Sequence, residues 1–166
     1  MQVSSRADID RLLRRLVAQE LPRRGGLEAW DAFLRAHATL MRRLDLDLAQ
    51  ATGLTLGDFD VLAQLARAGG ELRMTDLAAR VLLSRSAMTR RVSRLVEEGL
   101  ARRANADGDA RGVVVALTDA GLARLTDTAP VHMRGVSELF VEQLDDQELA
   151  VLTNALKKVT VDCTFG

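Results

Sequence analysis

The segment LSRSAMTRRVSRLVEEGL, residues 83–100, restricts the possible folds more than any other part of the chain. At about 100° per residue its apolar side chains form one stripe, which predicts a helix with one face in a core. The residues of this stripe are Met88, Val92, Leu95 and Val96. A shorter helix is expected just before it, starting near Thr75, whose hydroxyl can cap the free amides of DLAARV. Because only a few residues separate the two helices, the pattern predicts a helix-turn-helix unit.

The flanking sequence predicts a hairpin and several longer helices. Gly99 suits the left-handed residue that closes a helix, and beyond it LARRA and VVVALT flank the turn-rich stretch NADGDARG, a pattern typical of a β-hairpin. Apolar residues three and four apart predict further helices. Three of them cover residues 9–17, about 25 residues from Leu27, and residues 55–67. Two more follow near the end of the chain: Thr118 caps the first, and a capping box of Asp145 and Glu148 opens the second. We therefore expect a mainly α fold with a small β-hairpin wing, a winged helix-turn-helix flanked by long dimerisation helices.

This pattern divides the chain into three expected parts. Residues 1–52 would form N-terminal dimerisation helices, residues 53–117 the winged helix-turn-helix, and residues 118–166 the C-terminal dimerisation helices. The 23 basic and 23 acidic residues balance, so any electrostatic argument for a nucleic-acid partner has to be local. Between Ser84 and Arg111, seven arginines stand against four acidic residues, which leaves a net charge of +3 on an otherwise neutral chain.

The outward face of the 83–100 helix mixes guanidiniums with short hydroxyls. Arginine can pair with a guanine edge or a phosphate, while serine and threonine donate to phosphates without holding the helix away from DNA. The DNA-contacting candidates are Thr75, Ser84, Arg85, Ser86, Thr89, Arg90 and Arg94. An interaction scaffold that does not bind DNA is the alternative, although a protein-binding helix would show a more apolar surface there. We expect neither an enzyme nor a cofactor, because phosphate-loop, nucleophile and metal-ligand motifs are absent from the sequence.

From Leu54 to Gly121 the sequence resembles the multiple-antibiotic-resistance regulator (MarR) family of bacterial transcription factors. The resemblance rests on LLSRSAMTR followed by EEGLARR, then D-x-R and LTDAG. It implies a homodimer built by the terminal helices, with recognition helices in the major groove and hairpin wings against the minor groove. It also implies that Arg111 is the DNA-binding wing arginine and that Asp109 supports it, although Gly112 stands where many relatives carry another residue. The implied function is a ligand-responsive transcriptional regulator, expected to repress from a pseudo-palindromic operator.

The family resemblance also implies an unidentified small-molecule effector, often an aromatic acid or phenol, bound between the dimer helices and the DNA-binding lobe. Trp30, Phe33, His37 and His132 are pocket candidates. The favoured alternative is ordinary core packing for the two aromatic residues and a hydrogen-bonded interface or core histidine for the other two. The resemblance places redox-sensing cysteines near the start of the dimerisation region, whereas Cys163 is the fourth residue from the end, so we expect Cys163 to be inert rather than a redox sensor. Two histidines and one cysteine make a metal site improbable. Neither a secretory leader nor a membrane segment stands out, so a cytoplasmic protein is expected.

Overall fold

The structure is a computed structural model that describes residues 6–20, 25–81, 84–106 and 109–162. Within these ranges the side chains at 6, 13, 17, 85, 105–106, 109–112 and 161–162 lie outside the description. The chain forms two compact units, residues 1–41 and residues 42–166. The predicted division at residues 52 and 117 stays a prediction. None of the described helices has the length and apolarity needed to cross a lipid bilayer.

The first unit is helical. Helix α1 (Arg6–Glu20) matches the expected short amphipathic helix, and α2 (Gly26–Thr52) matches the expected long one. Along α1, Asp10 and Arg14 form an ion pair one turn apart, with 2.9 Å between Oδ2 and Nε, the spacing at which side chains on one helix face meet. Helix α2 begins in the first unit and continues into the second.

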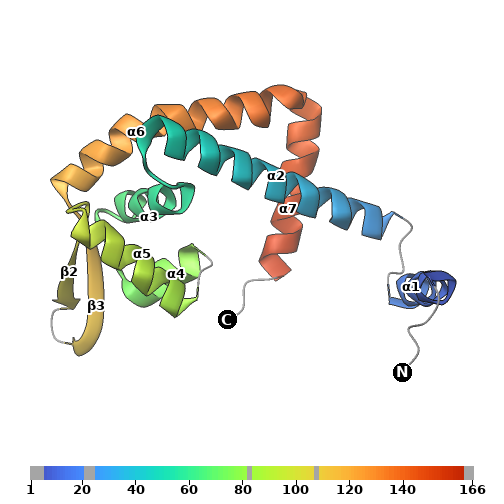
Figure 1. Ribbon diagram of the computed structural model, residues 1–166, viewed down its shortest axis with the longest axis horizontal. Coiled ribbons are helices and arrows are strands. Elements are labelled where there is room, and N and C mark those ends of the chain that lie inside the picture. The colour runs from blue at the N-terminus through green and yellow to red at the C-terminus, as the bar shows by residue number, and fades with distance from the viewer. Residues whose placement is uncertain (1–5, 21–24, 82–83, 107–108, 163–166) are drawn as a thin grey trace. The chain divides into compact units, whose positions relative to one another are not determined.

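The second unit contains the predicted helix-turn-helix and hairpin. In chain order its elements are α3 (Leu56–Arg67), β1 (Glu71–Arg73), α4 (Met74–Arg80), α5 (Arg85–Glu97), β2 (Ala101–Ala106), β3 (Asp109–Leu117), α6 (Asp119–Leu139), the short helix η1 (Val141–Gln143) and α7 (Asp146–Asp162) (Figure 1). The strands form an antiparallel sheet in the order β1-β3-β2. The architecture is the expected winged helix-turn-helix.

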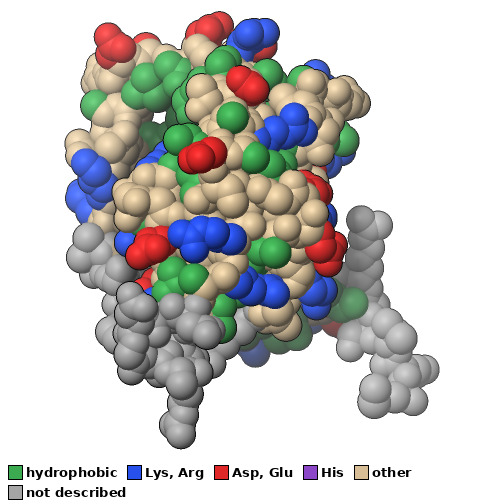
Figure 2. Space-filling model, turned by 90° about the vertical axis from the view of Figure 1, so that its left-hand side faces the viewer, with side chains coloured by type: hydrophobic (Ala, Val, Ile, Leu, Met, Phe, Trp, Pro, Cys, Tyr) green, Lys and Arg blue, Asp and Glu red, His purple; other side chains and the backbone are tan. Residues whose placement is uncertain are grey.

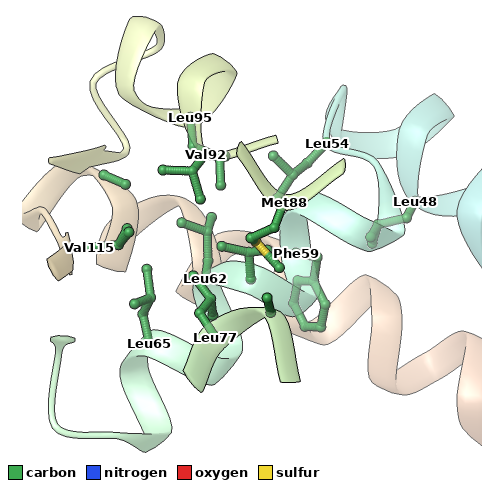
Figure 3. Packing of buried hydrophobic residues seen from close by; sticks show 13 residues of the cluster. Leu48, Leu54, Phe59, Leu62, Leu65, Leu77, Met88, Val92, Leu95 and Val115 are labelled. Atoms are coloured by element: carbon green, nitrogen blue, oxygen red, sulfur yellow. The ribbon is translucent and has the colours of Figure 1, made fainter. Parts of the chain in front are cut away.

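The core of this unit lies beneath α5 (Figure 3). Met88, Val92 and Leu95 are fully buried, as their spacing predicts. They pack with Leu62 and Leu65 of α3, Leu77 of α4 and Val115 of β3. Burying a side chain of this size stabilises a fold by about 1.5–3 kcal/mol. One face of α5 is therefore fixed, and its other face is turned outward.

The caps predicted at Thr118 and at the Asp145–Glu148 box form, and Thr55 provides a further cap that was not predicted. The Thr55 and Thr118 hydroxyls accept from the amides of Asp58 and Gly121, and the Asp145–Glu148 box forms in both directions at 2.8 and 2.9 Å. Gly99 adopts a φ of +73°, and the Leu100 amide donates to the Leu95 carbonyl at 2.8 Å, which closes α5 as a left-handed glycine does.

Two local features differ from expectation. Strand β1 was not predicted; it pairs residues 71–73 with residues 114–116 of β3. The predicted cap at Thr75 is wrong, because α4 begins at Met74 and Arg73, the last residue of β1, occupies the cap position without a side-chain cap bond. The Thr75 hydroxyl donates to the Asp76 carboxylate at 3.3 Å instead.

Candidate nucleic-acid interface

The outward face of α5 begins at its cap. The Ser84 hydroxyl accepts from the Ala87 amide at 3.3 Å and lies 3.2 Å from the Ser86 hydroxyl. Ser84, Ser86, Thr89 and Arg90 are all exposed, as predicted for side chains opposite the buried stripe. In the described part of the chain, Arg90 forms no ion pair with an acidic side chain. The Arg85 side chain lies outside the described residues.

Two other arginines of α5 are held by one carboxylate. Asp58 of α3 is 3% exposed, and its Oδ1 accepts from Nη1 of Arg91 at 3.0 Å while its Oδ2 accepts from Nη2 of Arg94 at 2.5 Å. Its hydrogen bond to Asp58 raises the pKa of Arg94, an effect that burial opposes and that the charges of Asp58 and Glu98 reinforce. Arg94 therefore already has an acidic partner inside the protein. Its contact with DNA stays a prediction.

The start of α3 is shaped to receive these arginines. A Cβ at Gly57 would collide with Nη1 of Arg91, so the missing side chain leaves room for the guanidinium. Arg91 also donates to the Thr55 hydroxyl at 3.2 Å. On the α2 side, Oδ1 of Asp45 accepts from the Leu56 amide at 2.8 Å. Charged hydrogen bonds thus join α5 to the start of α3. A hydrogen bond from the Leu56 amide joins the start of α3 to α2.

The pairing of Asp58 with Arg91 and Arg94 was not predicted from the sequence. Asp58 does occupy the first turn of α3, where its amide is capped by Thr55 and where a carboxylate is favourable. Its pairing with arginines 33 and 36 residues away leaves no periodic signal. The usable hint was that Arg91 and Arg94 stand three apart, on one side of the helix.

The hairpin adds a further arginine to the outward face of α5. Nη2 of Arg103, on β2, donates to the Ser93 hydroxyl at 2.8 Å and to the Thr89 carbonyl at 3.4 Å. The backbones of Asp109 and Arg111 lie in β3, but their side chains lie outside the described residues, so the predicted wing contact is untested. Figure 2 shows Lys and Arg side chains in separate groups, with Asp and Glu between them, on the face it views.

The pocket candidates fall into two groups. Trp30, Phe33 and His37 lie on successive turns of α2, and all three are exposed. The ring centroid of Phe33 lies 6.0 Å from that of Trp30 and 6.2 Å from that of His37. His132 lies on α6, with its ring centroid 4.6 Å from that of Phe59. Cys163 lies outside the described residues.

For His132 the sequence favoured a hydrogen-bonded interface or core histidine, which stays a prediction. Its Nδ1 is buried without a hydrogen-bond partner among the described residues, and so is the hydroxyl oxygen of Thr128, one turn earlier on α6. Burial lowers the pKa of His132, with Arg67 acting in the same direction and Asp60 opposing. The neutral form is thus favoured in the folded protein.

Helices α4 and α5 follow one another closely in the chain, and the β2–β3 hairpin of the three-stranded sheet lies beside α5. This arrangement defines the class of winged helix-turn-helix proteins. The MarR family model matches residues 52–112. AbsC, a MarR family transcriptional regulator from Streptomyces coelicolor, is 31% identical with a TM-score of 0.78, over 85% of this chain and 95% of AbsC. The chain belongs to the MarR family of transcriptional regulators.

Two further relatives extend the comparison. Sco3205, a MarR family transcriptional regulator from Streptomyces coelicolor solved in complex with DNA, is 28% identical with a TM-score of 0.79, over 84% of this chain and 88% of that one. The HTH-type transcriptional regulator PecS of Dickeya dadantii is 30% identical over 88 residues, which is 52% of this chain. The matched segment spans 53% of PecS, about half of its length.

Proposed function

We propose that this MarR-family regulator is a homodimer that binds a pseudo-palindromic DNA operator and represses transcription until a small molecule releases it. The observation that carries the proposal is the outward face of α5, where Ser86 and Arg90 are exposed while Met88 and Val92 on the opposite face are buried. The solved DNA complex of Sco3205 supports it by relationship. Such a protein would act in the cytoplasm, where the chromosome of the bacteria that carry these relatives lies.

In this proposal each part of the chain has one task. Residues 53–117 bind DNA, and residues 1–52 and 118–166 build the dimer. The recognition helix α5 enters the major groove, and the β2–β3 hairpin lies against the adjacent minor groove, with Arg111 as its DNA contact and Asp109 as the support. The proposed contacts from the helix-turn-helix are Thr75, Ser84, Arg85, Ser86, Thr89 and Arg90, with Arg94 as a secondary contact.

The DNA-binding part is tested by selection from a pool of random duplexes, followed by gel-shift titration of the enriched sequence. Arg90→Ala should weaken binding by about ten- to hundredfold, since a good bidentate base contact is worth about 1–3 kcal/mol. Lys157→Ala removes the same charge from an exposed position on α7 and should leave binding nearly unchanged. If no duplex is enriched, the scaffold alternative replaces this proposal.

The dimer is supported by apolar side chains that one chain leaves exposed. On α2 they are Leu27, Trp30, Phe33 and Leu34, and on α7 they are Val151, Leu156 and Val159. Apolar surface of this extent is typical of a protein interface. Light scattering after gel filtration should give twice the 18.1 kDa chain mass, and a two-fold dimer should select half-sites about 34–36 Å apart. A monomer at micromolar concentration would refute this part.

The effector part rests on the aromatic row of α2. Trp30 is the only tryptophan in the chain, so its fluorescence reports directly on binding there. Benzoate and phenol, the simplest aromatic acid and phenol, serve as probes; each should quench Trp30 saturably and lower the affinity for the selected duplex. A ligand shifts the DNA affinity only through its different affinities for the two dimer shapes. Quenching without any change in DNA affinity would rule out a regulatory role for that compound.

A further inference from the structure

Among the described side chains, the β2–β3 hairpin is buried in the core at its base. Ala101 of β2 is 3% exposed and Val115 of β3 is fully buried. Two residues further toward the turn, Val113 is 41% exposed. The ladder is also irregular at Asn105 and Ala106. Among the described side chains of β3, apolar burial therefore decreases from Val115 to Val113.

Arg103 joins this hairpin to the outward face of α5. It pairs with Val115 in the ladder and lies two residues after Ala101, so its side chain is on the strand face that packs toward the helix. Its Nη2 donates to the Ser93 hydroxyl at 2.8 Å. The Ser93 hydroxyl donates its one hydrogen to the Thr89 carbonyl at 2.9 Å. Its oxygen therefore acts as the acceptor toward Arg103. These two hydrogen bonds connect β2, through Ser93, to the α5 backbone at Thr89, one turn before Ser93.

We propose that Arg103 is a positioning residue, which acts through Ser93 to hold the wing at a fixed direction relative to the recognition helix. The inference rests on the proposed DNA-binding function, because the wing and the helix would have to fit neighbouring grooves at the same time. Holding the hairpin before binding removes ordering entropy from the binding step. Arg103 would then strengthen wing contacts that it does not itself make.

The competing role for Arg103 is a direct phosphate contact, and Ser93 distinguishes the two. Ser93→Ala removes the acceptor but no charge. If Arg103 acts through Ser93, Ser93→Ala weakens binding of the selected duplex about three- to tenfold, the range expected for one hydrogen bond. Ser93→Thr keeps a hydroxyl that can bond the same carbonyl and restores affinity. The double variant with Arg103→Gln binds no more weakly than Arg103→Gln alone.

Salt dependence and footprints separate positioning from a lost phosphate contact or a general loss of fold. The logarithmic salt slope of Ser93→Ala should equal that of the wild type, because no counterion release is lost. At saturating protein, hydroxyl-radical protection in the minor groove and methylation protection of guanine N7 in the major groove should both match the wild type, because the complex makes the same contacts at a higher ordering cost. Arg102→Gln, on the opposite face of the same strand, is the matched control and should show no coupling to Ser93→Ala. A slope lowered by about one in Arg103→Gln, with Ser93→Ala unchanged throughout, would overturn the proposal.

A DNA-free measurement keeps this inference separate from the proposed function. Hydrogen exchange of the free protein, followed by mass spectrometry, should be faster in 102–106 and 113–116 for both Ser93→Ala and Arg103→Gln. Exchange in α3 should not change, because its core contacts are intact. Unchanged exchange in the hairpin refutes the inference even if DNA binding is found. Failure of the wild type to bind any duplex refutes the proposed function, and the exchange result still decides whether Arg103 holds the hairpin.

Discussion

Replacing Asp58 with asparagine tests the arginine-to-carboxylate link between α3 and α5. The substitution keeps the side-chain shape and an oxygen that can accept from Arg91 or Arg94, but it removes the charge that both guanidiniums face. Deleting one member of a buried ion pair typically destabilises a protein by about 3–5 kcal/mol. Here the carboxylate is buried, but the Arg91 and Arg94 side chains are 26% and 47% exposed.

This exposure reduces the expected loss, because water can solvate the arginines that lose their partner. We therefore expect Asp58→Asn to lower the free energy of unfolding by about 1.5–3 kcal/mol. The assay is urea unfolding followed by circular dichroism, at one fixed protein concentration because dimerisation would contribute to stability. Arg91→Ala and Arg94→Ala should each lose less than Asp58→Asn, and their losses should not add, because both act on one carboxylate.

Asp60→Asn is the matched control. Asp60 stands two residues along the same helix and is half-buried, where it accepts a long 3.4 Å hydrogen bond from Gln64. Its substitution should change stability by less than about 0.5 kcal/mol. If Asp58→Asn is no more harmful than Asp60→Asn, the reasoning that one buried carboxylate ties α5 to α3 is refuted.

Three further outcomes are expected from urea unfolding. Met88→Ala should cost about 2–5 kcal/mol, because Met88 is fully buried beneath α5, and a loss under about 1 kcal/mol would contradict the packing. Ser84→Ala should cost about 1 kcal/mol through the lost cap of α5, and Ser84→Asn should restore most of it. Because the pKa of His132 is lowered below its ordinary value of about 6.5, its neutral form stabilises the fold fully above that pH. This stabilisation should decline as the pH falls toward the lowered pKa, and His132→Gln should remove that pH dependence; an unchanged dependence would exclude His132 as its source.

Most of the fold was predictable because its elements are long enough to show a period. The stripe of α5 predicted burial of Met88, Val92, Leu95 and Val96; the first three are fully buried and Val96 is half-buried. The caps at Ser84 and Thr118 form because a hydroxyl directly before a helix satisfies free amides. Strand β1 escaped prediction because three residues carry no period and gain their structure from pairing with β3. That pairing also places Arg73 where Thr75 was expected to cap α4.

The candidate site was predictable in its surface but not in its internal partners. A helical wheel places Ser86 and Arg90 opposite the core, and both are exposed. The wheel cannot reveal that Asp58 approaches the same helix from 36 residues away, or that Arg103 reaches Ser93 from the hairpin. Such pairings depend on how elements pack, which a period within one element does not encode. Nor does the sequence show that Nδ1 of His132 lies buried without a hydrogen-bond partner among the described residues.

These internal partners change the electrostatic argument for DNA binding. The local excess of +3 between Ser84 and Arg111 counts Arg91 and Arg94 as surface charges and leaves out Asp58, which lies outside that segment. Including Asp58 reduces the excess to +2, and Arg103 is further engaged with Ser93. An arginine-rich segment therefore overstates the charge available to phosphates whenever some guanidiniums serve to attach the helix. Of the α5 arginines whose side chains are described, those at 91 and 94 turn toward α3. Arg90 has no acidic partner among the described residues, so we predict that it contributes to sequence specificity.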